Sequence, residues 1–120
     1  MMKDFKSLKV WQKSHQLVLQ VYKNTRSFPK AEMYGLTNQL RRACISIASN
    51  ISEGCGRGSD ADFARFAQMS MGSASEAEYQ ILLSHDLAYL ETPVFNKLTL
   101  DVTEIKRMLT ALIKKLKAKS

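Results

Sequence analysis

Few residue combinations in this sequence have the types and spacing that catalysis needs. The segment most similar to a phosphate-binding loop is Gly54-Cys55-Gly56-Arg57-Gly58. It lacks the Gly-Lys-Ser/Thr ending of nucleotide-binding loops, follows a predicted helix rather than a strand, and does not match Gly-x-Gly-x-x-Gly. We interpret these glycines as a helix terminator and a turn, in which they supply positive φ values.

Metal and acid–base chemistry have equally little support. A di-iron site in a helical bundle needs Glu-x-x-His pairs, and no glutamate here has a histidine at the third following position. His15 and His85 are the only histidines. Both lie near predicted apolar faces, so we expect them to be packed and hydrogen-bonded. Asp86 follows His85, but neighbouring residues on a helix are expected to point apart. We therefore predict a non-enzymatic protein without cofactor or metal.

Positive charge is the stronger chemical signal. The chain carries a formal net charge of +7, and its basic residues concentrate in residues 1–58 and 97–120. Such a balance favours a polyanionic partner, whereas a solvated basic surface that aids solubility is the alternative. The candidate nucleic-acid contacts are Arg41, Arg42, Arg57, Arg65, Lys114, Lys115 and Lys117. A structural alternative is that Arg41 and Arg42 pair with acids of the third predicted helix.

The elements that position these residues are predicted to be helices. Apolar residues recur at spacings of three and four, and no segment shows the alternation of a strand. Phe28-Pro29 ends the first helix, Ser59 is the expected cap of the third, and Thr92 is the expected cap of the fourth, with Pro93 at its first position. The predicted helices span residues 7–27, 36–54, 60–90 and 93–117. Short connections between them predict an all-α, up-down-up-down four-helix bundle in one domain, residues 1–120.

Packing and compartment can also be predicted. Gly72 lies among small residues and costs about 1 kcal/mol relative to alanine, so we expect a neighbouring helix to pack tightly against it. Cys44 and Cys55 are about 16 Å apart along one helix, too far for a disulfide, and are expected to be buried.

No apolar run approaches the ~20 residues of a membrane helix. With no apolar leader, we expect a cytoplasmic protein.

Several polar positions are expected to serve assembly rather than chemistry. A buried asparagine or glutamate costs stability unless it is hydrogen-bonded, but it can specify register and partner. We predict one polar network, inside a bundle or between bundles, formed by Asn50, Glu53, Glu76 and Glu78.

A set of motifs resembles a known family over nearly the whole chain. The motifs are Phe5-x-x-Leu8-x-Val10-Trp11-Gln12, Phe28-Pro29-x-x-Glu32-x-Tyr34-Gly35-Leu36-Thr37, Gln39-Leu40-Arg41-Arg42-Ala43, Ser46-Ile47-x-x-Asn50-Ile51-x-Glu53-Gly54, Arg57, Phe63, Arg65-Phe66, Gly72-Ser73-Ala74 and Glu76. In combination they resemble the bacterial four-helix-bundle proteins encoded in intervening sequences of 23S ribosomal RNA genes. Ala77 departs from the family, which often has leucine there.

The resemblance implies an up-down bundle and, for some relatives, a ring-shaped homopentamer. The chain is also similar to the accessory variability protein of diversity-generating retroelements, a basic pentameric ring that works with a reverse transcriptase and its template RNA. We therefore expect a homo-oligomer that binds RNA or DNA, with Arg41, Arg42, Arg57 and Arg65 at family positions. The alternative is a scaffold that docks a protein such as a reverse transcriptase or a ribosome-associated protein, without direct contact to nucleic acid.

Overall fold

The computed structural model describes residues 4–119, which form helices joined by short connections. Four long helices and two short 3₁₀ turns account for the regular structure in this range, and no strand occurs in it. They are η1 (Phe5–Ser7), α1 (Lys9–Thr25), η2 (Lys30–Glu32), α2 (Leu36–Cys55), α3 (Asp60–Asp86) and α4 (Thr92–Lys119).

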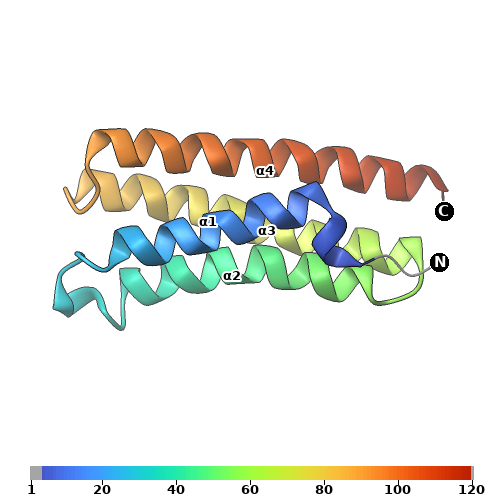
Figure 1. Cartoon of the computed structure of the whole chain (residues 1–120), viewed down its shortest axis with the longest axis horizontal. Coiled ribbons are helices and arrows are strands. Elements are labelled where there is room, and N and C mark those ends of the chain that lie inside the picture. The colour runs from blue at the N-terminus through green and yellow to red at the C-terminus, as the bar shows by residue number, and fades with distance from the viewer. Residues whose placement is uncertain (1–3, 120) are drawn as a thin grey trace.

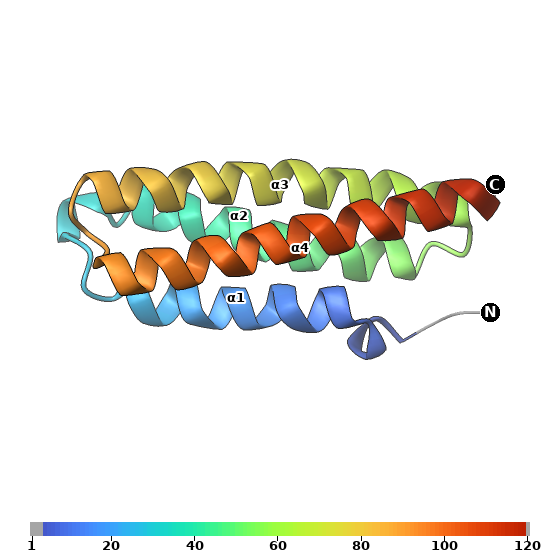
Figure 2. The same ribbon diagram turned by 90° about the horizontal axis from the view of Figure 1, so that it is seen from above.

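The long helices lie side by side and alternate in direction along the chain (Figure 1; Figure 2). α1 packs against α2 and α4, and α3 packs against the same two helices, so α1 and α3 occupy diagonal positions. The result is an elongated bundle of 45 × 22 × 20 Å. The predicted all-α, up-down-up-down four-helix bundle is therefore confirmed for residues 4–119.

The core lies along the bundle axis and is formed by the apolar positions that recur every three or four residues. Fully buried side chains come from every long helix. They include Leu17 and Val21 of α1, Leu40, Ile47 and Ile51 of α2, Ile81 of α3, and Leu98, Val102, Ile105 and Leu109 of α4. Because α1 is shorter than its neighbours, Phe5 of η1 and Leu8 cover the end of the bundle beside Cys55, Phe63 and Leu116.

Helix ends follow local chemistry, with some shifts from the expected bounds. Ser59 caps α3 as predicted, because its Oγ accepts a hydrogen bond from the Asp62 amide at 3.2 Å. α3 ends at Asp86, and Ala88 adopts a left-handed φ of 65° in the connection that follows. α4 begins at Thr92, whose Oγ1 lies 3.2 Å from Nε2 of His85. The predicted cap at Thr92 is wrong in register, because the first helical amide bond runs from Phe95 N to Glu91 O.

The predicted roles of the glycines are confirmed in part: α2 ends at Cys55 with Gly56 as its C-cap, and Gly58 supplies a positive φ. Gly58 has a φ of +90°, whereas Gly56 has a φ of −86° and Gly54 lies inside α2. A Cβ atom on Gly54 would lie 2.6 Å from Cβ of Phe66, so this glycine permits the close approach of α3. At Gly72, a Cβ atom would meet nothing within 4 Å. The predicted tight packing at Gly72 is therefore wrong within one chain.

Polar contacts tie the helices together at both sides of the core. Asp101 of α4 is only 7% exposed, and its carboxylate lies 2.8 Å from Nζ of Lys97 and 3.6 Å from Nζ of Lys13 in α1. At the η2 end, Glu32 accepts hydrogen bonds from the Leu36 amide at 3.1 Å and from the Tyr89 hydroxyl at 3.0 Å. The bond from Tyr89 to the Glu32 carboxylate raises the pKa of Tyr89.

Cys44 and Cys55 are buried and form no disulfide with one another, as predicted. Burial raises the pKa of the Cys44 thiol to about 12, so this thiol stays protonated at neutral pH and is a poor nucleophile. Among residues 4–119, no helix has both the length and the apolar character needed to cross a membrane.

Candidate nucleic-acid interface

Three of the predicted contact residues meet at the end of the bundle where α2 ends, α3 begins and α4 ends. Arg57 follows α2 and Arg65 lies in the second turn of α3, and each guanidinium carbon lies 4.8 Å from the centre of the Phe66 ring. Arg65 and Lys117 of α4 line one open pocket of about 350 Å³. We call the surface formed by Arg57, Arg65 and Lys117 the basic end.

The Phe66 ring holds the two arginines close to one another. Phe66 is buried, and stacking of a guanidinium on an aromatic face is worth about 0.5–1 kcal/mol at an exposed site. The side chains of Arg57 and Arg65 still remain 45% and 59% exposed. The two guanidinium groups are therefore partly pre-positioned and still accessible to a ligand.

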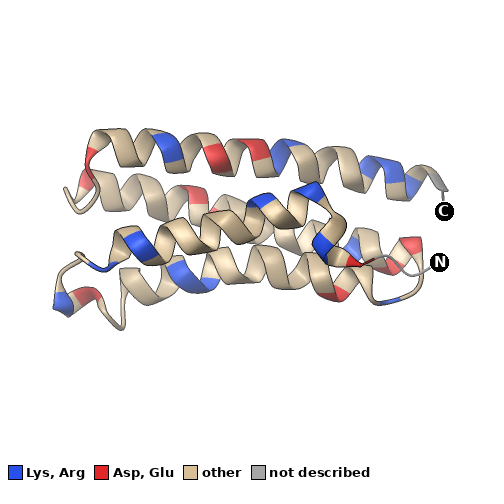
Figure 3. Ribbon diagram, viewed as in Figure 1, with Lys and Arg blue, Asp and Glu red and all other residues tan. Residues whose placement is uncertain are grey.

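Each arginine of the basic end also has an acidic neighbour. Arg57 pairs with Glu53 at 3.1 Å, and Arg65 pairs with Asp62 at 3.4 Å. Exposed pairs of this kind contribute only about 0–1 kcal/mol, so a stronger anionic ligand can replace them. Lys114 and Lys115 extend the positive charge along the last turns of α4, where basic residues gather in Figure 3.

Arg41 and Arg42 do not lie at the basic end. Arg42 and Arg57 are separated by fifteen positions, roughly 20 Å along the helix axis. Arg41 donates a hydrogen bond from Nε to Thr25 Oγ1 at 2.9 Å, and its guanidinium lies 4.5 Å from the centre of the Tyr22 ring. Arg41 thus joins α2 to α1, and the alternative that it pairs with acids of α3 is wrong.

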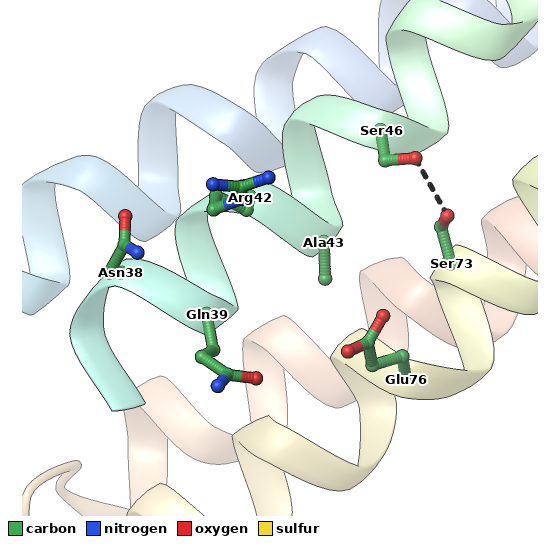
Figure 4. A pocket seen from close by; sticks show the side chains of 7 residues that line it. All are labelled: Asn38, Gln39, Arg42, Ala43, Ser46, Ser73 and Glu76. Atoms are coloured by element: carbon green, nitrogen blue, oxygen red, sulfur yellow. Dashed lines mark hydrogen bonds between the residues drawn. The ribbon is translucent and has the colours of Figure 1, made fainter. Parts of the chain in front are cut away.

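Arg42 points to the other side of α2, toward α3. It lines an open pocket of about 440 Å³ between the two helices. Among residues 4–119, Arg42 makes no ion pair. The pocket, which we call the polar pocket, is lined by Asn38, Gln39, Arg42, Ala43, Ser46, Ser73 and Glu76 (Figure 4).

Inside one bundle, the predicted network of Asn50, Glu53, Glu76 and Glu78 does not form, because these side chains have separate partners. Asn50 Nδ2 donates to Ser46, whose hydroxyl also accepts from Ser73 Oγ at 2.9 Å. Glu53 pairs with Arg57, and Glu78 pairs with Lys106 of α4 at 2.9 Å. Glu76 accepts a hydrogen bond from Gln80 Nε2 at 3.3 Å. A network between bundles stays a prediction.

Apolar side chains are exposed near the opposite end of the bundle, a feature that the sequence pattern did not indicate. Tyr34 is 90% exposed and Tyr79 is 60% exposed. The exposed apolar residues of η2, its following turn and the end of α3 are Met33, Tyr34, Tyr79, Leu82 and Leu87, and we call them the apolar end. Tyr79 and Leu87 border an open pocket of about 360 Å³.

The histidines pack against aromatic rings, as expected. The His15 ring stacks on Trp11 with centres 5.0 Å apart, and the His85 ring stacks on Phe95 with centres 4.2 Å apart. Nδ1 of His85 lies 3.7 Å from Oδ1 of Asp86, so the expectation that these neighbours point apart is wrong at this helix end. Within the described part of the chain, no three His, Cys, Asp or Glu side chains gather in a way that could hold a metal ion.

The fold and motifs agree with a comparison against protein families. The family model described as 23S rRNA-intervening sequence protein matches residues 6–111. The chain belongs to this family. Six of the seven residues that line the polar pocket belong to the motifs named above: Gln39, Arg42, Ala43, Ser46, Ser73 and Glu76.

A solved structure supports the same assignment. It is the crystal structure of a protein with unknown function from the S23 ribosomal protein family of Bacteroides thetaiotaomicron. The two chains are 25% identical, the match covers 88% of this chain and 95% of the other, and the TM-score is 0.80. No curated protein sequence matches the chain.

Proposed function

We propose that this family member is a non-catalytic, cytoplasmic homo-oligomer that binds RNA or DNA through the basic end. The observation that supports this proposal most directly is the arrangement of Arg57 and Arg65 on the Phe66 ring, with Lys117 beside Arg65. Arginine forms paired hydrogen bonds to phosphate, and a guanidinium already held on a ring loses less freedom when it binds. Lys114 and Lys115 add positive charge at the same end.

The acidic partners of the basic end do not oppose this function strongly. Glu53 and Asp62 are exposed and form surface pairs that salt screens. A nucleic-acid backbone offers several phosphates at once, and each neutralised phosphate releases a condensed counterion. Binding through this surface should therefore depend steeply on salt and little on base sequence.

Assembly of several copies would bring several basic ends, each a weak binding surface, into one particle. The apolar end and the exposed Gly72 of α3 supply surface that a second copy of the chain can bury. In a ring, for which the family resemblance implies five copies, several basic ends contact one polymer at the same time. Effective concentration then raises the overall affinity without any new contact.

The test is the salt dependence of binding to labelled RNA and DNA oligonucleotides of one length. A double variant, Arg57→Gln with Arg65→Gln, should weaken binding to all sequences and reduce the salt slope by about 2. The matched control is Lys23→Gln with Arg26→Gln, which removes the same charge from exposed residues at the other end of the bundle. Absence of binding at about 50 mM salt and micromolar protein would contradict the proposal.

A protein-interaction scaffold is the second candidate, and the exposure of Tyr34 and Tyr79 favours it. In that case the apolar end docks a protein partner and the positive charge is incidental. Capture of a purified reverse transcriptase or ribosome-associated protein would survive nuclease treatment. It would also be lost in a Tyr34→Ser and Tyr79→Ser double variant, whereas the Arg57→Gln and Arg65→Gln variant would retain it.

A further inference from the structure

The polar pocket between α2 and α3 has features of a ligand site that is separate from the basic end. Its volume of about 440 Å³ falls within the roughly 300–1,000 Å³ of small-molecule sites. Figure 4 shows the side chains of Gln39 from α2 and Glu76 from α3 directed toward the space between the helices, with Ala43 between them. Side chains from two rigid helices thus converge on one open space.

The hydrogen-bonding capacity of the pocket is only partly used by the protein. Ser46 and Ser73 bond to one another at 2.9 Å, so their hydroxyls are engaged. Glu76 accepts one long hydrogen bond, 3.3 Å from Gln80 Nε2, and no other within residues 4–119. Gln39 and Arg42 donate no side-chain hydrogen bond within the same residues. The two carboxylate oxygens of Glu76 therefore lie across the pocket from the side-chain donors of Gln39 and Arg42 on α2.

The charges on the two walls limit the chemistry of the ligand. The Glu76 carboxylate disfavours a phosphate beside it, and the Arg42 guanidinium disfavours a bare cation beside it. A ligand that presents N–H donors to Glu76 and a carbonyl acceptor to Gln39 satisfies both walls. A nucleobase edge provides this combination without charge, and unpaired bases of single-stranded RNA expose it.

Among the four RNA bases, guanine fits this arrangement best. Its Watson–Crick edge carries two adjacent donors, N1–H and the N2 amino group, beside the O6 acceptor. Adenine and cytosine place a ring-nitrogen lone pair opposite the carboxylate, and uracil offers one N–H between two carbonyls. Glu76 is exposed in the open pocket, and the other bases would replace its water contacts with fewer hydrogen-bond donors, which lowers their affinity.

We propose that the polar pocket binds a guanine of single-stranded RNA, which gives a base preference to the backbone binding of the proposed function and rests on it. Glu76 accepts hydrogen bonds from N1–H and the N2 amino group, and Gln39 donates to O6. Arg42, at the exposed rim, contacts the phosphate of the same nucleotide. The polar pocket thereby specifies a base, while the basic end, roughly 20 Å away along α2, binds backbone.

The test compares uridine oligonucleotides of one length that carry a single central guanosine, inosine or adenosine. We expect guanosine to bind about tenfold more tightly than adenosine, with inosine between them because it lacks the N2 amino group. Glu76→Gln should abolish this preference, and the matched control Glu91→Gln, an exposed glutamate outside the pocket, should retain it. The Arg57→Gln and Arg65→Gln variant should weaken all three oligonucleotides equally and leave the ratio unchanged.

A second arm of the experiment separates the two proposals. GMP and AMP are titrated into the isotopically labelled protein, and the side-chain amide signal of Gln39 is followed by NMR. A shift with GMP and none with AMP supports the pocket even where RNA binding fails, which would overturn the proposed function alone. Equal affinity for guanosine and adenosine oligonucleotides, with no GMP-specific shift, overturns the guanine site and leaves backbone binding intact.

Discussion

The substitution Gly54→Ala is expected to destabilise the bundle, although alanine is the better helix former. Gly54 is buried in α2 where α3 crosses closely. A new Cβ atom would lie 2.6 Å from Phe66 Cβ and 3.0 Å from Phe63 Cδ1. The Phe63 ring can rotate, but the Cβ atom of Phe66 moves only with its helix. α2 and α3 must therefore separate locally by about 1 Å to restore ordinary contact distances.

The expected change in the unfolding free energy of Gly54→Ala is the sum of two opposing contributions. Replacing glycine by alanine in a helix interior gains about 1 kcal/mol of unfolding free energy. Overpacking of a well-packed interior costs about 1–3 kcal/mol, and the fixed position of Phe66 Cβ places this site at the upper end of that range. The net expected loss for Gly54→Ala is about 2 kcal/mol.

Gly72→Ala is the matched control because it makes the same chemical change without the steric term. Nothing lies within 4 Å of a Cβ atom at Gly72, so this variant should gain up to about 1 kcal/mol. The difference between the two variants, about 3 kcal/mol, is the cleaner quantity because the helix-propensity gain cancels. It should separate their melting temperatures by roughly 10 °C.

The assay is urea and thermal denaturation followed by circular dichroism at one protein concentration, since assembly makes the midpoint depend on concentration. Native mass measurement of both variants reports the oligomeric state. The reasoning is refuted if Gly54→Ala is as stable as Gly72→Ala. A fall in the oligomeric state of Gly72→Ala, with the fold intact, would instead place Gly72 in a contact between copies.

Two further substitutions test a buried thiol in the core and the ion pairs of Asp101. For Cys44→Ala, the unfolding free energy should depend less on pH above about pH 9. Burial raises the thiol pKa of Cys44 from 9.0 to about 12, so the wild type loses stability as the pH rises through that window. The variant has no thiol and lacks this contribution. Urea titrations at several pH values measure the difference, and parallel curves would contradict it. Asp101→Asn should lower the unfolding free energy by about 1–2 kcal/mol, because it removes the charge that Lys97 and Lys13 face at 2.8 and 3.6 Å. Asp86→Asn, at an exposed site near the end of α3, is its control, and an equal effect of the two changes would count against a special role for Asp101.

The buried positions of the helices could be predicted from sequence because burial along a helix repeats every 3.6 residues. Leu40, Ile47 and Ile51 could therefore be placed in the core without coordinates. The N-cap of α3 at Ser59 could be predicted for a similar reason, since it depends on two residues three positions apart. Such local patterns do not depend on which helix packs against which.

The candidate site was harder to predict because adjacent residues on a helix point about 100° apart. Arg41 and Arg42 are identical in type, yet Arg41 contacts Tyr22 and Thr25 of α1, and Arg42 lines the pocket beside α3. Their different surroundings follow from the arrangement of α1 and α3 on either side of α2. The apolar end was missed because exposed tyrosine and leucine look in sequence like core residues.

By itself, the sequence of this family member determined the helical class, the order of the helices and most of the buried positions, because these depend on local periodicity and capping. Only the tertiary structure decided which polar residues meet. It placed Arg57, Arg65 and Lys117 at one end and Arg42 and Glu76 in a separate pocket. It also assigned Gly54 to a helix crossing and Gly72 to the surface, since packing depends on neighbours that are distant along the chain.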